Sequence, residues 1–349
     1  MPGFGSTATH GISGPAFAFP AGLPQYGAVV DLDTWLTVFG SLNIDISVTV
    51  PRLPAPGATV LGGAAAFAPG GKGANQAVAA ARLGADSGIR VRMVGCVGDD
   101  DFGRTMRATL NEEGIDDRAV RTVRGAPTGI AMITVDESGE NIITVAPGAN
   151  REPGPREIEA IGGESTKVLV ISAEVPVAAI RAVLDGPRRP LTVLNLAPAP
   201  PAAEAAGLLR ARPDWLVVNE SEAAAVLGRP VGGLAEAARA AADLVAAGAR
   251  NAVVTAGAAG AAYHGDDRGS DGTVAAFPVR AVDSVGAGDT FVGALAVLLA
   301  AETPAREAVT AASAAGATAA TRPGTQTGMP RPADIGPATG FAWPLEVAG

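Results

Sequence analysis

Short apolar runs alternate with helical patterns along most of this chain of 349 residues. The runs are rich in Val, Leu and Ile and are typical of buried strands, whereas the stretches between them have helical periodicity. We expect strands at Leu36–Ser41, Val91–Val97, Val168–Ser172, Thr192–Leu196, Trp215–Asn219 and Ala252–Thr255. We expect helices at Asn75–Leu83, Gly103–Glu113, Val177–Leu184, Ser221–Leu227, Leu234–Ala247, Ala287–Ala301 and Ala305–Ala320. This alternation predicts an α/β fold with a mostly parallel sheet flanked by helices on both faces.

Two regions and the two ends break the pattern. Ile44–Phe67 and Thr128–Val145 are predicted to be extended segments with turns. Residues 1–33 are rich in Gly, Pro, Ala and Ser, which predicts a flexible extension or an over-called translation start. We expect the main domain at 34–335, a surface-covering segment after about Gly328 and a tail at 336–349.

Composition narrows the function. The net charge of −9 argues against a nucleic-acid surface, which needs a basic patch. The single cysteine, Cys96, excludes an intramolecular disulfide and is expected to be a buried thiol at a strand end. The longest apolar stretch, Phe291–Ala301, is too short to span a bilayer, and no secretion signal is evident at the N-terminus. We therefore expect a soluble cytoplasmic protein.

The segment Asp283–Phe291 carries the strongest chemical signal. Gly286, Ala287 and Gly288 precede an apolar helix, so their backbone N–H groups can attract an anion at the helix N-terminus. Asp289 stands beside them as a carboxylate that can take a hydroxyl proton. An anion-binding turn next to a base is what phosphoryl transfer to a hydroxyl requires. The alternative interpretation is an ordinary loop with Asp289 as a helix cap.

Two upstream blocks supply polar groups. Asn43 and Asp45 follow an expected strand two residues apart, so in an extended segment both project to one side and can bind sugar hydroxyls; they could equally form a turn. The loop Gly70–Asn75 permits close backbone approach and adds Lys72 and Asn75 as donors. Lys72 is one of two lysines in the chain, and Asn75 could instead cap the helix that follows. The loop lacks the Lys-Ser/Thr ending of a P-loop.

These three blocks, in this order, resemble the ribokinase family of phosphofructokinase-B-type sugar kinases. The resemblance runs from about Leu36 to about Gly328. It implies a ribokinase-like three-layer fold in which the two extended segments, about 44–67 and 128–145, form a small β-sheet lid. It also implies that the lid pairs with a second subunit in a homodimer.

The resemblance implies a role for each motif. Sugar binding falls to Asn43, Asp45, Gly71, Lys72, Gly73, Asn75, Glu174 and Asp289, although Glu174 could simply be a solvated residue after a strand. ATP binding falls to Asn219, Thr255, Ala256, Gly257, Ala258, Ala259, Gly260, Gly288, Asp289 and Ser313. Glu222, in Asn219-Glu220-Ser221-Glu222, is implied to act on Mg²⁺ indirectly; the same four residues also fit a capping box. Residues 255–260 could also be a plain β-turn.

A potassium site is implied at Asp283, Val285, Ala319, Arg322 and Gly324, where the family's basic residue before the glycine is replaced by Pro323. The reaction implied is transfer of the γ-phosphoryl group of ATP to the 5-hydroxyl of D-ribose, with Asp289 as base. Fructokinase, deoxyribokinase and nucleoside kinase activities are alternatives within the family. A sugar-binding regulator without catalysis is the alternative from another class, and the intact Asp289 and glycine turn argue against it.

Overall fold

The computed structural model describes residues 34–161, 166–186, 190–266 and 270–345, so the expected extension at 1–33 lies outside the described residues. Among them, a nine-stranded sheet has the order β13-β12-β11-β10-β9-β8-β1-β4-β5. Its strands are β1 (Trp35–Phe39), β4 (Arg90–Gly98), β5 (Asp116–Val123), β8 (Thr166–Ser172), β9 (Leu191–Asn195), β10 (Trp215–Asn219), β11 (Asn251–Thr255), β12 (Gly260–Gly265) and β13 (Gly272–Ala275). All pairs from β5 to β11 are parallel, and β12 and β13 are antiparallel.

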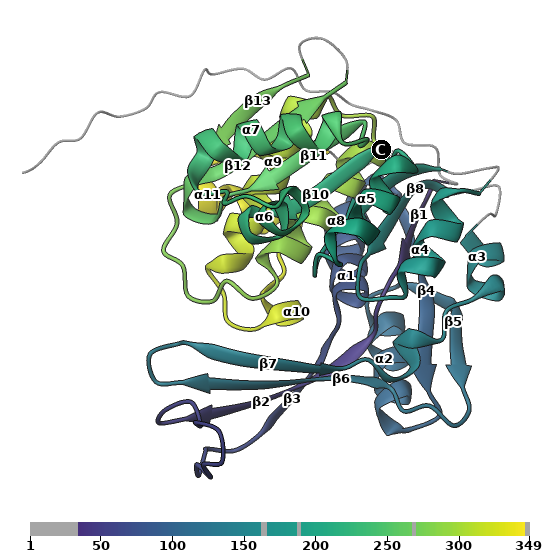
Figure 1. The fold of residues 1–349 in the computed structure, drawn as a ribbon, viewed down its shortest axis with the longest axis vertical. Coiled ribbons are helices and arrows are strands. Elements are labelled where there is room, and N and C mark those ends of the chain that lie inside the picture. Colours follow the sequence, from purple (N-terminus) through teal and green to yellow (C-terminus); the bar gives the residue numbers. More distant parts are fainter. Residues whose placement is uncertain (1–33, 162–165, 187–189, 267–269, 346–349) are drawn as a thin grey trace, which may run out of the picture.

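Helices cover both faces of this sheet, which confirms the predicted α/β class (Figure 1). Along β8, Val168 and Val170 enter one apolar cluster while Leu169 and Ile171 enter the other, because successive strand side chains point to opposite faces. The first cluster is completed by α1 (Lys72–Gly84), α2 (Asp101–Glu112), α8 (Ala287–Ala300), α9 (Ala305–Ala320) and α11 (Pro332–Thr339). The second is completed by α3 (Pro155–Ile161), α4 (Val177–Leu184), α5 (Ala202–Arg210), α6 (Glu220–Leu227) and α7 (Gly233–Ala246).

A second, four-stranded sheet forms the lid. Its order is β3-β2-β6-β7, with bounds Ala66–Gly70, Asn43–Val50, Gly129–Asp136 and Asn141–Ala146. The strands project away from the large sheet (Figure 1). The prediction of two extended segments is therefore confirmed, and each segment contributes one pair of adjacent strands.

Small residues let the central helices pack closely. α1 and α8 cross at Gly293, where an added Cβ would lie 2.7 Å from the Cβ of Ala79. This close approach holds the start of α1 against the start of α8, and the expected site residues lie at both starts. The low aromatic content of 4% is consistent with a core built from Ala, Val, Leu and Ile.

One helix start differs from expectation, and two residues interpreted as possible caps lie inside their helices. The helix expected from Asn75 begins at Lys72, because Gly71 takes a φ of 86° that favours glycine and acts as the N-cap. The Asn75 N–H donates to the Gly71 carbonyl, so Asn75 lies inside the helix and its interpretation as a cap is wrong. Asp289 is likewise the third residue of α8 and not its cap, which is Gly286.

The chain after Gly328 does more than cover the surface. Met329 and Ile335 are buried in the first apolar cluster, and α11 runs across the expected boundary at residue 335. The Pro- and Gly-rich composition concealed this helix, whose first residue is Pro332, a favoured position for proline. Also missed were β5, β12, β13, α3, α5 and the short α10 (Thr325–Gly328).

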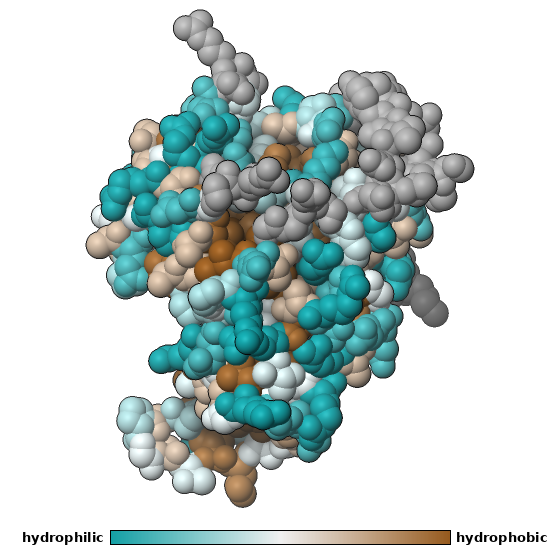
Figure 2. Space-filling view, turned by 90° about the vertical axis from the view of Figure 1, so that its right-hand side faces the viewer, coloured by the Kyte–Doolittle hydropathy of each residue, from teal (hydrophilic) through white to brown (hydrophobic). Residues whose placement is uncertain are grey.

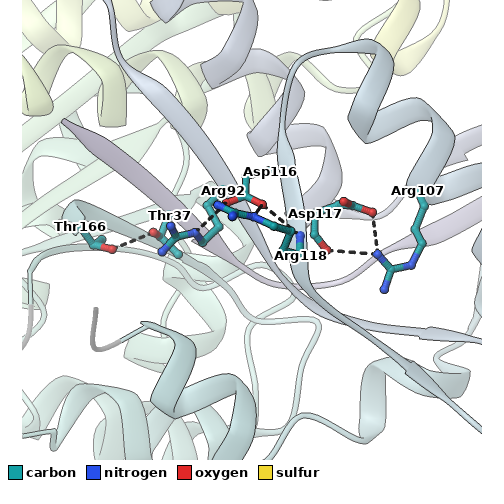
Figure 3. A network of polar contacts seen from close by, with 7 residues as sticks. All are labelled: Thr37, Arg92, Arg107, Asp116, Asp117, Arg118 and Thr166. Carbon is teal, nitrogen blue, oxygen red and sulfur yellow. Dashed lines mark hydrogen bonds and ion pairs between the residues drawn. The ribbon is translucent and has the colours of Figure 1, made fainter. Parts of the chain in front are cut away.

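Ion pairs brace the sheet far from the lid. Arg92 of β4 and Arg118 both bind Asp116, and Arg107 of α2 binds Asp117 at 2.6 Å (Figure 3). The pKa of Asp116 lies well below its usual range, and the hydrogen bond from the Arg118 side chain is the main cause. The network lies towards the amino ends of β4 and β5, so its role is structural. Within the described residues, no helix is both long and apolar enough to cross a membrane.

Candidate active site

A cleft of about 570 Å³ lies where the lid meets the carboxyl ends of the parallel strands. Because parallel strands end at the same edge, Glu174, Asn195, Asn219 and Thr255 meet there from four successive strands. The cleft brings together many of the residues expected to bind sugar, nucleotide or a metal ion or to take part in catalysis: Asn43, Asp45, Gly71, Lys72, Asn75, Glu174, Asn219, Glu222, Thr255, Val285, Gly286, Gly288 and Asp289. Lid residues complete its wall: Ala131, Ile133, Ile143 and Val145.

Asp289 is buried at the junction of the two ends of the cleft. One carboxylate oxygen accepts a hydrogen bond from Nδ2 of Asn75 at 3.0 Å, and the other accepts one from Nε2 of Gln76 at 3.0 Å. Each oxygen keeps a further acceptor position, since a carboxylate offers about four. The geometry therefore leaves Asp289 able to accept a proton from a hydroxyl in the cleft.

The glycine turn before α8 offers two free donors. Gly286 has a φ of 79°, and both Gly286 and Gly288 line the cleft. Among the described residues, no acceptor pairs with the N–H of either glycine. The N–H of Ala287 differs from expectation, because it donates to the Ser284 carbonyl at 3.2 Å and closes the turn. In this part of the described chain, the N–H groups of Gly286 and Gly288 therefore remain open to an anion, and that of Ala287 does not.

Asn43 and Asp45 lie two apart on β2 and both line the cleft. The Asn43 amide is fixed by Asn150, whose Nδ2 donates to Asn43 Oδ1 at 2.7 Å. Asn150 is itself held by two bonds to the backbone of Leu42. Since the oxygen of Asn43 is occupied, its NH₂ group remains as the donor for a ligand. Sequence reasoning missed Asn150, which follows the lid strands.

Glu174 connects two loops, the one at Ser41 before Asn43 and the glycine-rich loop at Lys72. Its Oε2 accepts from Ser41 Oγ at 2.5 Å and from the Lys72 N–H at 3.1 Å. It is therefore not a solvated residue at a strand end. Gly73 does not line the cleft; an added Cβ would lie 2.6 Å from Gly40 C and Ser41 N, so it serves close packing.

Acidic side chains outnumber basic ones among the residues that line the cleft. Burial, followed by the charges of Glu174 and Asp289, raises the pKa of Asp45 to about 6, although Lys72 partly offsets this. The Asp289 carboxylate is the main cause of a raised pKa for Lys72. Lys72 therefore stays protonated as a half-buried cation, in a position to meet an anionic group.

The nucleotide end contains the capping box that the sequence allowed. The Asn219 side chain accepts from the Glu222 N–H at 2.9 Å, and Glu222 Oε2 accepts from the Asn219 N–H at 2.8 Å. Both residues also line the cleft, so the capping box does not prevent them from facing a ligand. Burial raises the pKa of Glu222.

Several residues expected to bind ATP lie outside the cleft lining. Residues 256–260 form a tight turn after β11, in which the Ala256 N–H donates to the Gly260 carbonyl and the Ala259 N–H donates to the Ala256 carbonyl. Thr255 alone of that motif reaches the cleft. Ser313 lies on α9 and donates to the Val309 carbonyl at 2.8 Å.

The residues of the expected potassium site lie together. Asp283 accepts from the Val285 N–H at 3.0 Å and from the Gly324 N–H at 2.9 Å, which ties the turn before α8 to the loop before α10. The carbonyl oxygens of three further residues converge beside Gly328, where an added Cβ would lie 3.3–3.6 Å from those of Ala319, Arg322 and Pro323. Carbonyl and carboxylate oxygens are the kinds of ligand that suit a hard cation.

Further unexpected residues surround the base. Asn195 lines the cleft at the end of β9, and Gln76 and Gln326 bond to Asp289 and Asn75 respectively. Asn195 could have been found by the same rule of strand ends that indicated Glu174. No local signal marks Gln326, because its partner is 251 positions away.

Comparisons with known proteins agree with this geometry. Residues 33–332 match the pfkB family of carbohydrate kinases. The chain is 36% identical over 298 residues to a ribokinase of Haemophilus influenzae, covering 84% of this chain and 95% of the relative. It is also 34% identical over 264 residues to a deoxyribokinase of Salmonella typhi, covering 75% of this chain and 84% of the relative.

Solved structures give the same result. A ribokinase from Thermotoga maritima superposes with a TM-score of 0.77 at 30% identity, covering 86% of this chain and 98% of that one. Arabidopsis thaliana ribokinase complexed with ribose and ATP superposes with a TM-score of 0.77 at 27% identity, covering 88% and 99%. This chain therefore belongs to the pfkB family of carbohydrate kinases, whose reaction is ATP-dependent phosphorylation of a sugar.

Proposed function

We propose that this protein transfers the γ-phosphoryl group of ATP to the 5-hydroxyl of D-ribose. The observation that carries the proposal is the position of Asp289, a buried carboxylate between sugar-facing side chains and a turn with two free N–H donors. The likeness to several ribokinases supports ribose as the acceptor.

The sugar end positions the acceptor. Asp45 accepts hydrogen bonds from sugar hydroxyls, and the free NH₂ group of Asn43 donates one. Glu174, which follows β8, and Lys72, at the start of α1, line the same cleft. Matching of donors and acceptors in a cleft that excludes water favours sugar hydroxyls over an apolar ligand.

Phosphoryl transfer then follows from the charges. Asp289 takes the proton of the 5-hydroxyl as the oxygen attacks the γ-phosphorus, and the bond to the β-phosphate oxygen breaks to release ADP. The N–H groups of Gly286 and Gly288, together with Lys72, meet the negative charge on the transferred group. Glu222 lies where it can bind the water shell of Mg²⁺, which neutralises phosphate charge when bound with ATP. Closure of the lid excludes water and so prevents ATP hydrolysis.

ADP release measured with D-ribose, 2-deoxyribose, fructose and nucleosides tests the acceptor directly. We expect the highest kcat/KM with D-ribose. The comparable identity to a deoxyribokinase makes 2-deoxyribose the sharpest competitor, and a higher kcat/KM with it, or with a nucleoside, would contradict the proposal.

We also propose that potassium binds between Asp283 and the carbonyl oxygens of the 319–324 loop. The convergence of Ala319, Arg322 and Pro323 carbonyls supports this position. By holding the loop, the cation would fix the turn that carries the N–H groups of Gly286 and Gly288, which matters because preorganised donors stabilise developing charge best.

Activity is expected to rise when potassium replaces a bulky organic cation at constant ionic strength and saturating magnesium. Asp283→Ala should blunt this response, because it removes the carboxylate that joins Val285 to Gly324. Initial rates of ADP release in the two salts are the measurement. Equal rates for the unmodified protein in both salts would show that no such site controls turnover.

The lid is proposed to pair with the lid of a second copy. Large apolar side chains are exposed on the lid face that points away from the cleft, namely Phe67, Met132 and Ile142. Figure 2 shows apolar surface at the lower end of the molecule, where the lid lies. Burying such a patch in a symmetric contact is favourable.

We expect sedimentation to give a dimer and Ile142→Asp to shift the equilibrium towards monomer. A monomer at all concentrations of the unmodified protein would contradict the pairing.

A further inference from the structure

The base is held by two amide side chains that do not come from its own helix. Asn75 and Gln76, consecutive residues of α1, each donate to one oxygen of Asp289 at 3.0 Å. An amide can present either its NH₂ group or its oxygen, and only the NH₂ group stabilises a carboxylate. The orientation of each amide must therefore be fixed by something else.

Gln326 fixes the orientation of Asn75. Its Nε2 donates to Asn75 Oδ1 at 3.0 Å, so the NH₂ group of Asn75 is directed at Asp289. Since the carboxylate only accepts, the hydrogen bonds can run in one direction alone, from Gln326 through Asn75 to Asp289. Gln326 is 8% exposed and does not line the cleft.

The helix that carries Gln326 is itself attached to α1. Arg82 of α1 donates to the backbone carbonyls of Gln326 at 2.6 Å and of Met329 at 2.9 Å, and it forms an ion pair with Glu113. The N–H of Gly324, the N-cap of α10, donates to the carboxylate of Asp283. The backbone of α10 is thus fixed at both of its ends, by Asp283 at Gly324 and by Arg82 at Gln326 and Met329.

The second amide has a different and independent support. Gln76 Nε2 also donates to Asn195 Oδ1 at 2.9 Å, and Asn195 Nδ2 donates to the Val217 carbonyl at 3.1 Å. The orientation of this branch is set by a backbone carbonyl of the sheet. Loss of Gln326 should therefore disturb one oxygen of Asp289 while the other stays held.

We propose that Gln326 is a positioning residue for the base: it orients the Asn75 amide and through it the Asp289 carboxylate. The inference rests on the proposed role of Asp289 as the base. It assigns to Gln326 an effect on the chemical step, with no contact to ribose or ATP.

Two substitutions separate orientation from packing. Gln326→Met keeps the length of the side chain but removes the donor, and we expect kcat to fall about tenfold because the Asn75 amide is free to turn. Gln326→Glu replaces the donor with an acceptor, so Asn75 turns its NH₂ group to residue 326 and its oxygen to Asp289. We expect a fall of about a hundredfold, since two acceptors then face each other. The KM for ATP should stay unchanged in both variants.

The control is an amide remote from the cleft. Asn111 of α2 is exposed and donates to the Arg107 carbonyl, so Asn111→Glu should leave kcat and KM unchanged. Rates are divided by the folded fraction from thermal melts, so that a loss of stability alone does not lower the corrected kcat.

The outcomes distinguish the inference from the proposed function. The positioning role is supported if the corrected kcat of both variants is below that of the unmodified protein and that of Gln326→Glu is the lower of the two. Corrected kcat unchanged in both Gln326 variants, while Asp289→Asn is inactive, would leave the base in place and overturn the role of Gln326. A rise in ribose KM alone would also overturn it, because it would assign Gln326 to sugar binding in the ground state.

Discussion

Asp289→Asn is expected to lower kcat by about 10²–10⁴-fold, the usual contribution of a general base. The amide keeps the size of the side chain but cannot take the proton of the 5-hydroxyl. It also places an NH₂ group opposite one of the two donors, Asn75 or Gln76, that the carboxylate now satisfies. The fall should appear in kcat, because the proton is transferred only in the transition state.

Calorimetry of ribose binding to Asp289→Asn provides the control for this loss. We expect ribose affinity to change little, because Asn43, Asp45 and Glu174 keep their positions. A melting temperature close to that of the unmodified protein would show that the fold is kept. Turnover near the normal rate in this variant would remove Asp289 from the mechanism.

Asp45→Ala is expected to weaken ribose binding by about 10–150-fold, with ATP affinity little changed. Hydrogen bonds to a charged partner contribute about 1.5–3 kcal/mol, and the loss leaves sugar hydroxyls unpaired in a partly closed cleft. Asp45 is on β2 of the lid, away from Asn219 and Thr255 at the nucleotide end. Titration calorimetry with ribose and, separately, with ATP checks the difference.

The pH dependence of binding provides an internal check on Asp45. Because burial and the neighbouring carboxylates raise its pKa to about 6, the charged acceptor is present above pH 6 and is lost as the pH falls through that value. Ribose affinity of the unmodified protein should therefore fall between pH 7 and pH 5, whereas that of Asp45→Asn should vary less. An equally steep fall in both proteins would assign the titration to another group.

The alternation of apolar runs predicted six of the nine described strands of the large sheet, β1, β4, β8, β9, β10 and β11, and the edge at which the site lies. Glu174, Asn219 and Thr255 each follow a parallel strand, and that rule alone places them together. The composition of the C-terminal segment was a poor guide, because one proline begins α11 and Ile335 is buried all the same.

The groups that orient the site residues could not be predicted. Asn150 reaches Asn43 because β2 pairs with β6 in a register that places Asn43 beside Gly129, and no local pattern encodes that register. Gln326 reaches Asn75 through the packing of α10 on α1. The N–H of Ala287 is paired with the Ser284 carbonyl because this turn closes, and the sequence motif does not specify that closure.

The most direct test of the account compares D-ribose with 5-deoxyribose, which lacks the proposed acceptor hydroxyl and is otherwise matched. We expect stoichiometric release of ADP with D-ribose, a product whose phosphorus couples to the hydrogens on C5 in the NMR spectrum, and no ADP above background with 5-deoxyribose. Phosphorylation of 5-deoxyribose, or a phosphate on another carbon of ribose, would contradict the assignment of Asp289 as the base for the 5-hydroxyl.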